Sequence, residues 1–224
     1  MITVIIPTLN EADYLTPLLG DLSPQIDGHE IIVADGGSVD DSLVIAEKFG
    51  AKIIRSDQGR GQQLKAGADH ACGKVLLFLH ADSRFPRDGL AAIERQLIDQ
   101  PACVGGNFRL VFDGDTRFSR WLIKFYAWIR KLGVYYGDSG IFARREIYIQ
   151  IGGIQPFALM EDYDFSRRLE KAGPTCCIAE PALITSSRKF EGRHAPAIIW
   201  GWFKIHALYH FGVSPEKLAK LYYG

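Results

Sequence analysis

The sequence predicts an α/β fold in which helices flank a mostly parallel central sheet and a helical C-terminal extension follows. Three apolar runs, rich in β-branched residues or leucine and too short for helices, indicate buried strands at residues 2–6, 30–34 and 75–79. A short polar cluster follows each run: PTLNE at 7–11, DGGS at 35–38 and HADS at 80–83. Ligands of open α/β sheets lie beyond the carboxyl ends of the strands, so these clusters should meet at one edge of the sheet.

The first hundred residues continue this alternation of strand and helix. We expect helices over 12–22 and 39–49, a third strand over 51–55, a short helix over 64–72, a fourth strand over 74–79 and a helix over 89–98. This rhythm is typical of βαβ units. It then changes, and we expect a strand over 103–112, helices over 118–132 and 165–172, and a helical tail from Ala195.

Composition and charge exclude several classes of protein. The chain has 224 residues, 47% of them hydrophobic, which suits a globular core. Its 26 basic and 26 acidic residues cancel, so no overall field favours a nucleic-acid partner. The four cysteines lack zinc-ligand spacing and the density of a secreted disulfide scaffold. With no basic leader and no apolar stretch long enough to span a bilayer, we expect a cytoplasmic protein.

The first two polar clusters each have a functional and a structural interpretation. Pro7 cannot donate to a β-ladder, so it should end the first strand, and Thr8 and Glu11 then offer polar groups where a helix begins. A plain helix cap is the alternative. Asp35 ends an apolar strand before two glycines, where it could accept a hydrogen bond from a base N–H. An Asp-Gly turn is the alternative for that residue.

Two further clusters carry charge. Residues 59–65 form a glycine-rich basic turn with Arg60 and Lys65, which suits phosphate, although neither a dinucleotide fingerprint nor a phosphate-loop motif is present. His80 and Asp82 alternate at a strand end and could reach one Mg²⁺ or Mn²⁺ ion. The alternatives are that Asp82 caps the next helix and that His80 is a satisfied core histidine.

Three carboxylates crowd together just before a predicted helix, at Glu161, Asp162 and Asp164. Their mutual repulsion should raise at least one pKa, and a carboxylate so placed can serve as a general base. Helix N-termini also attract acids, so complementation of the helix dipole is the alternative.

As a set, these motifs resemble the family 2 glycosyltransferases of the GT-A fold, from the nucleotide-diphospho-sugar transferase superfamily, over about residues 2–191. The resemblance implies a nucleobase contact from Asp35 and a metal contact from Asp82, the last aspartate of the D-x-D signature. The residues it assigns to the nucleotide are Pro7, Thr8, Glu11, Asp35, Gly36, Arg60, Lys65 and Ala81. It implies one domain with a nucleotide-binding half over about 1–100, an acceptor half over about 101–194 and a helical tail over 195–224.

The second half of the chain matches the same family at two stretches. GDSGIFARR at 137–145 resembles an acceptor-side strand and turn, and MEDYDF at 160–165 resembles the E-D motif. By that match Asp162 is the base, and Glu161 orients or contacts the acceptor. Weaker candidates for the diphosphate or the acceptor are Asp138, Arg188, Lys189, Arg193 and His194, for whose basic members a solvated loop is the alternative.

Three departures from the family pattern limit what it implies. His80 stands where the first aspartate of D-x-D is usual, which puts its ribose contact in doubt and could lower metal affinity. Lys65 stands where asparagine is common, as a phosphate contact or a surface charge. The Q-x-x-R-W element of polymerising members is absent, which favours a short, non-processive bacterial type of enzyme.

The resemblance therefore implies a metal-dependent inverting transfer from a nucleotide-diphospho-sugar, with UDP favoured by family frequency and Mn²⁺ or Mg²⁺ as cofactor. The acceptor could be a small molecule, a saccharide or a lipid-linked compound. A non-catalytic nucleotide- or membrane-binding module is one alternative. A sugar nucleotidylyltransferase is another, but its glycine-rich signature should follow the first strand, where PTLNE stands.

Two segments are amphipathic, at 118–132 and in the tail from Ala195. Their aromatic and basic residues could lie on the inner face of an anionic membrane and meet a lipid-linked acceptor. The alternative is that their apolar faces pack on the domain or across a homodimer.

Overall fold

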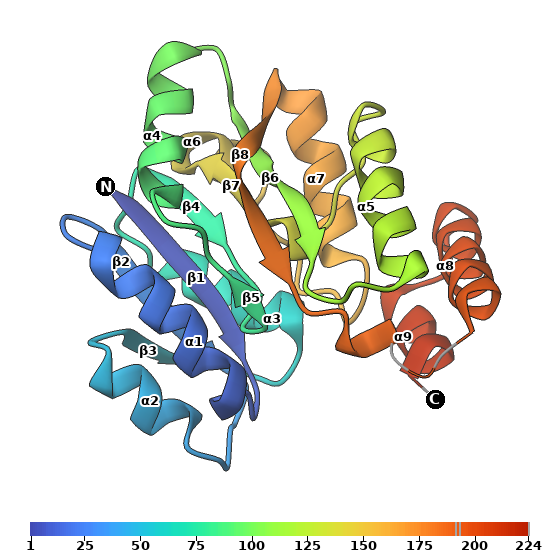
Figure 1. Ribbon diagram of the computed structural model, residues 1–224, viewed down its shortest axis with the longest axis horizontal. Helices are drawn as coiled ribbons and strands as arrows, with labels where there is room; N and C mark the ends of the chain where they lie inside the picture. Colours follow the sequence, from blue (N-terminus) through green and yellow to red (C-terminus); the bar gives the residue numbers. More distant parts are fainter. Residues whose placement is uncertain (191, 193, 224) are drawn as a thin grey trace.

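The computed structural model describes residues 1–190, 192 and 194–223, apart from the side chain of Lys189. Helices flank one eight-stranded sheet, in the order β3-β2-β1-β4-β7-β6-β8-β5 (Figure 1). Its strands are β1 (Ile2–Thr8), β2 (Glu30–Asp35), β3 (Lys52–Arg55), β4 (Val75–Phe78), β5 (Ser83–Arg84), β6 (Gly105–Phe112), β7 (Ile141–Arg144) and β8 (Thr175–Thr185). The predicted α/β fold is confirmed.

The helices alternate with these strands through most of the chain. They are α1 (Ala12–Leu22), α2 (Ser42–Lys48), α3 (Arg60–Asp69), α4 (Gly89–Asp99), α5 (Arg117–Arg130), α6 (Arg145–Gln150), α7 (Glu161–Ala172), α8 (Ala195–His210) and α9 (Pro215–Tyr223). Short 3₁₀ turns lie at η1 (Ser23–Gln25), η2 (Gly137–Ser139) and η3 (Arg188–Phe190). The helix expected at 12–22 is therefore confirmed, and that expected at 89–98 is confirmed to within one residue.

Helices cover both faces of the parallel part of the sheet. Consecutive residues of β1 point to opposite faces, so neighbouring side chains pack against different helices. Val4 packs on the side of α1, α2 and α4, whereas Ile5 packs on the side of α3, α6 and α7. Strands β3, β2, β1 and β4 run parallel. β7 is inserted antiparallel between β4 and β6, and β8 returns parallel to β6. The sheet is thus continuous from the first half of the chain into the second.

Pro7 does not end the first strand, which was a wrong prediction. Strand β1 continues to Thr8, and Pro7 pairs in register with Ala34 of β2. The ladder with β4 stops earlier, at Ile5 and Phe78, followed only by the bond from the Leu79 N–H to the Ile5 carbonyl. In a parallel strand residues 5 and 7 direct their backbone groups to the same neighbour. Proline therefore occupies a position where no ladder partner remains.

Three other local expectations were wrong for physical reasons. Helix α3 begins at Arg60, not at residue 64, because Gly61 lets its first turn approach the backbone of 155–157. Helix α7 begins at Glu161, so the three carboxylates lie in its first turn. His80 and Asp82 lie in a turn closed by the bond from the Ser83 N–H to the His80 carbonyl. Strand alternation therefore does not apply to that pair.

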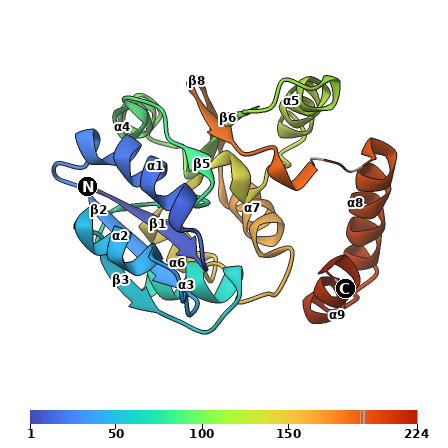
Figure 2. The same ribbon diagram turned by 60° about the horizontal axis from the view of Figure 1, so that its bottom comes forward.

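Helices α5, α8 and α9 lie at one end of the molecule, beyond the last long strands (Figure 2). Helix α5 buries Leu122, and α8 buries Ile198 and Ile205, against small apolar clusters of the same chain. Ile129 of α5 is also buried. These faces follow the packing alternative for the amphipathic segments. None of the described helices is both long and apolar enough to cross a bilayer.

Candidate active site

Hydrogen bonds between side chains and backbone groups hold the carboxyl ends of β1 and β2. Asp35 is 2% exposed, and its carboxylate accepts from the N–H groups of Gly37, at 3.1 Å, and Ser38, at 3.0 Å. Gln63, from α3, donates to the carbonyls of Thr8, at 2.7 Å, and Ala34, at 3.0 Å. Asp35 therefore makes the turn that was its structural alternative, while remaining at the edge where a ligand of this fold would lie.

The Arg188 guanidinium lies between the carboxylates of Glu11 and Asp82 at the same edge of the sheet. Arg188 Nη2 is 3.0 Å and 3.1 Å from the two carboxylate oxygens of Glu11, and Arg188 Nε is 3.4 Å from Asp82 Oδ2. Its guanidinium also covers the ring of Tyr14, at 3.9 Å from the centroid. Burial raises the pKa of Glu11, with Arg188 opposing that shift and the charge of Asp82 adding to it. Arg188 thus offsets part of the negative charge of an acidic pair, Glu11 and Asp82, from the turns after β1 and β4.

This acidic pair fits a divalent cation by its chemistry. Carboxylate oxygens are the ligands that Mg²⁺ and Mn²⁺ prefer, and such ions complete their shells with phosphate oxygens and water. Within the described part of the chain, no three His, Cys, Asp or Glu side chains are grouped to hold a metal by themselves. A metal at Asp82 would therefore need oxygens from a bound ligand.

Asp162 is held as a carboxylate by its surroundings. Its Oδ2 accepts from the Gly137 N–H at 2.9 Å, and its Oδ1 accepts from the Tyr163 N–H at 2.7 Å. Burial by itself would raise the pKa of Asp162, but the charge of Arg60, these backbone bonds and the charge of His80 outweigh burial and lower it. Asp162 is consequently ionised at neutral pH.

Its neighbour Glu161 has the opposite tendency. The Glu161 side chain is fully buried, and its Oε1 accepts a hydrogen bond from Arg60 Nε, while Oε2 has no partner among the described residues. Burial raises the pKa of Glu161, Arg60 opposes that shift, and the charge of Asp162 adds to it. Two adjacent carboxylates therefore differ in proton affinity, which is a common property of acid and base pairs in active sites.

Glycine is required at position 137 by the approach of two side chains. A methyl group there would lie 2.7 Å from His80 Nε2 and 3.3 Å from Asp162 Oδ2. Asp138, the next residue, is buried and accepts a hydrogen bond from Tyr126 Oη at 3.1 Å. The turn η2 thus brings His80, Asp138 and Asp162 to one place.

These residues form the inner end of a pocket of about 800 Å³. Asp138 and Asp162 are buried, whereas Phe203 and Tyr223 are exposed, so the carboxylates lie inside and the aromatic rings surround the mouth. The lining residues are Arg60, His80, Phe125, Tyr126, Tyr136, Asp138, Leu159, Met160, Asp162, Ile199, Trp202, Phe203, Ile205, His206, Tyr222 and Tyr223. Among the predicted site residues, the structure therefore gathers Arg60, His80, Asp138 and Asp162 here.

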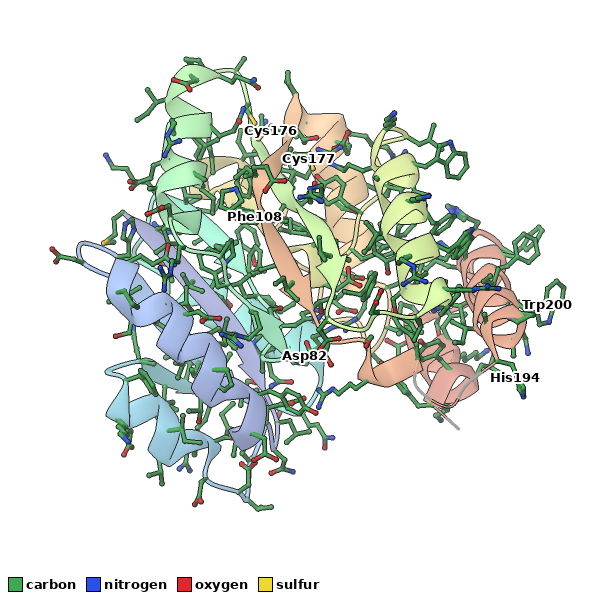
Figure 3. All side chains as sticks on the ribbon, in the orientation of Figure 1. Asp82, Phe108, Cys176, Cys177, His194 and Trp200 are labelled. Atoms are coloured by element: carbon green, nitrogen blue, oxygen red, sulfur yellow. The ribbon has the colours of Figure 1, made fainter. Side chains whose placement is uncertain are left out.

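Other predicted residues lie elsewhere. Lys65 is exposed on α3 and pairs with Asp69 at 2.7 Å, outside this group. His194 lies exposed at the start of α8, far along the molecule from Asp82 (Figure 3). Ala81 is buried in the turn between His80 and Asp82. Arg193 and the side chain of Lys189 lie outside the described residues.

Several residues of the site had no signal that we recognised in the sequence. Tyr136 and His206 form a hydrogen bond at 2.9 Å, and the ring of His206 stands edge-on to Tyr163 with centroids 4.8 Å apart. They join α8 to the first turn of α7, next to Asp162. The three residues are far apart in the sequence, so only the folded chain brings them together. The aromatic pair Tyr135 and Tyr136, directly before the GDSG motif, was the available hint.

Comparison with known proteins identifies the family. The sequence profile of "Glycosyl transferase family 2" matches residues 3–157, which is more than half of the chain. The chain belongs to glycosyltransferase family 2. PGL/p-HBAD biosynthesis glycosyltransferases of Mycobacterium tuberculosis and Mycobacterium bovis are 33% identical to this chain over 204 residues. The alignment covers 83% of this chain and 72% of each relative. A glucosyl-3-phosphoglycerate synthase of M. tuberculosis is 30% identical over 92 residues, covering 36% and 28% of the two chains.

Solved structures share the GT-A fold of this glycosyltransferase. A Pyrobaculum calidifontis mannosyltransferase in complex with GDP-Man and Mn²⁺ aligns with TM-score 0.68 and 19% identity, over 99% of this chain and 68% of that one. The M. tuberculosis glucosyl-3-phosphoglycerate synthase in complex with Mn²⁺ and UDP-glucose aligns with TM-score 0.60 and 18% identity, over 88% and 73%. The chain is therefore a glycosyltransferase with the expected fold.

Proposed function

We propose that this glycosyltransferase transfers one sugar from a nucleotide-diphospho-sugar, with a UDP-sugar favoured, to an acceptor hydroxyl. One observation carries the proposal: the ionised carboxylate of Asp162 lies at the inner end of a wide pocket, beside Arg60. A carboxylate held in this way can take the proton of a hydroxyl as that hydroxyl attacks a sugar carbon. The transfer would invert the anomeric configuration, because the attack and the departure of the diphosphate occur in one displacement.

The donor would lie at the edge formed by the turns after β1, β2 and β4. Asp35 and Thr8 are fixed there by Gln63 and by backbone N–H groups, which supports a rigid nucleoside pocket. Glu11 and Gly36 border the same edge. The UDP-glucose complex of one structural relative favours uracil, and the GDP-mannose complex of another keeps guanine as an alternative.

The charged residues have distinct parts in the proposed reaction. Arg60 and the Gly137 N–H would keep Asp162 ionised. Glu161 would orient Arg60 and contact or orient the acceptor. Arg188 would leave Glu11 and Asp82 to contact the diphosphate, since a guanidinium stabilises phosphate charge well. Mn²⁺ or Mg²⁺, held by Asp82 with His80 as a further predicted ligand, would offset the charge of the diphosphate.

A calorimetric titration with UDP tests the donor site. We expect binding in Mn²⁺ that weakens at least tenfold in EDTA, because Asp82 would hold a metal ion whose charge Arg188 does not replace. The Asp82→Asn variant should lose most of this metal dependence, whereas Asp115→Asn, an exposed aspartate paired with Arg120, should keep it. Equal affinity for UDP in Mn²⁺ and in EDTA would remove the metal from the proposal.

Contact with a membrane surface is also part of the proposal. Its support is the set of exposed aromatic side chains on α5 and α8, among them Trp121, Trp128 and Trp200, with exposed Lys124 and Lys204 nearby in sequence. In Figure 3 the Trp200 side chain extends outward from α8. Co-sedimentation with phosphatidylglycerol vesicles tests this contact, and light scattering of the purified protein tests the homodimer.

A further inference from the structure

The outer wall of the pocket is mostly aromatic and aliphatic. On α8, Ile199, Trp202, Phe203 and His206 recur with helical spacing, so one face of this helix lines the pocket. Phe125 of α5 and Tyr222 of α9 line other sides. Such a wall contributes area for apolar contact but few hydrogen bonds.

Permanent positive charge is scarce among the described residues that line the pocket. Among its described lining residues, Arg60 is the one permanent cation, and Arg60 is already paired with the buried Glu161. The inner end carries the carboxylates Asp138 and Asp162. A phosphate or carboxylate on the acceptor would meet these two carboxylates there, which disfavours an anionic acceptor.

We propose that the acceptor is an uncharged hydroxyl compound with an apolar body, aryl or alkyl, that inserts this body between α5, α8 and α9. The volume of about 800 Å³ is within the range of pockets that enclose ligands of drug size. The proposal rests on the proposed transferase function, and it names the acceptor class for the same site.

The transfer step balances with this placement. The acceptor hydroxyl gives its proton to Asp162, and its oxygen forms a new bond to the anomeric carbon of the sugar. The bond from that carbon to the diphosphate oxygen breaks, and its electron pair leaves with the nucleoside diphosphate. The apolar body stays in the aromatic wall and holds the hydroxyl at Asp162, which is the positioning that accelerates such a displacement.

Three glucosides that differ only in their aglycone test the acceptor class. Phenyl, hexyl and methyl β-D-glucoside would each be titrated calorimetrically, with and without UDP and Mn²⁺. We expect the phenyl or the hexyl compound to bind about tenfold more tightly than the methyl compound, because burying the aglycone removes apolar area from water. A preference between phenyl and hexyl separates an aromatic acceptor from an aliphatic one.

Phe203 offers a sharp variant because it lines the pocket yet is 62% exposed, so its removal should leave the fold intact. Phe203→Ala should reduce the affinity for the apolar glucosides about fivefold and leave UDP binding unchanged. Phe211→Ala is the matched control, since Phe211 is 86% exposed and is not among the residues that line the pocket. The control should bind every ligand as the parent does.

Each outcome decides between the two proposals. Equal binding of all three glucosides, no binding of any of them, or equal behaviour of Phe203→Ala and Phe211→Ala would overturn the apolar acceptor site. Selective glucoside binding without any binding of UDP, GDP or dTDP would leave this site standing and refute the proposed transfer. UDP binding with tighter binding of 3-phosphoglycerate than of the apolar glucosides would overturn the acceptor class alone.

Discussion

At the scale of single residues, Glu161 and Asp162 show how two adjacent carboxylates in one helical turn can have pKa values shifted in opposite directions. Both lie near Arg60, yet the pKa of Glu161 is raised and that of Asp162 is lowered. Burial acts on both, but Asp162 also accepts two backbone N–H bonds, whereas one oxygen of Glu161 has no partner among the described residues. Because Arg60 lowers the pKa of both carboxylates, the two backbone donors to Asp162 are a difference that makes Asp162 the stronger candidate for the base.

Replacing Asp162 tests that assignment. Asp162→Asn should lower the transfer rate by about 10² to 10⁴, the usual contribution of a general base, while UDP affinity stays within about twofold. Asp164→Asn is the control from the same turn, because Asp164 pairs with Arg168 and faces Tyr209 instead of the pocket. Rates come from release of UDP, and affinities from calorimetry. A transfer rate equal to that of the parent would exclude Asp162 as the base.

At the scale of elements, α3 secures the donor edge through one side chain. Gln63 is buried and joins β1 to β2 through two carbonyl oxygens, and its amide lies just over 3 Å from where a methyl group on Gly36 would be. A side chain at position 36 would therefore press on this amide and displace it slightly. The rigidity of the nucleoside pocket should depend on that contact.

The variant Gln63→Leu removes both bonds and leaves the carbonyl of Ala34 without its side-chain donor. We expect the free energy of unfolding in urea to fall by about 1–3 kcal/mol, the cost of unsatisfied buried polar groups. UDP affinity should fall with it, because the Asp35 turn loses its support. Gln62→Leu, one residue earlier and exposed, should change the free energy of unfolding by less than about 0.5 kcal/mol. Similar losses in both variants would contradict the bridging role.

Helix α8 packs against Tyr136 and Tyr163 through His206, and protonation of His206 opposes this contact. Burial lowers the pKa of His206 below the ordinary 6.5, the charge of His210 lowers it further, and Asp162 opposes the shift. At pH values between that lowered pKa and 6.5, His206 would bind a proton more readily when α8 is released than when α8 is docked. Docking is therefore complete above this window and weakens as the pH falls through it.

Hydrogen exchange checks this dependence. Corrected for intrinsic rates, amide exchange in α8 should be faster at pH 5.5 than at pH 7.5, because protonated His206 disfavours its place against Tyr136 and Tyr163. His206→Phe should abolish the difference. His194→Phe, at the exposed N-cap position of α8, should keep the difference between the two pH values. The same protection at both pH values in the parent protein would contradict a role for His206.

At the scale of the whole molecule, the sequence predicted the first half of the fold better than the second. Strands β1, β2 and β4 are short, buried on both faces and followed at once by polar residues, so local pattern was sufficient. Strand β8 was missed because it pairs with β6 across many intervening residues and its burial does not alternate cleanly. The antiparallel β7 was expected only through the family resemblance.

The candidate site divides in the same way. Asp162 and Arg60 lie in short sequence motifs, from which both were predicted as site residues. Tyr136, His206 and Tyr223 acquire their positions from contacts between helices that are distant in the chain, which no local pattern encodes. The residues proposed for the chemistry therefore stand in local motifs, whereas most of those that line the proposed acceptor pocket do not.

The packing of α5, α8 and α9 has a consequence for how such an enzyme can change. These helices are held by two small apolar clusters, separate from the two large clusters on the faces of the sheet. Substitutions at Ile199, Phe203 or Tyr222 consequently reshape the pocket wall at little expense to the stability of the donor edge. If the proposed acceptor pocket is correct, a mutant library confined to those three positions should change acceptor preference while UDP binding is kept.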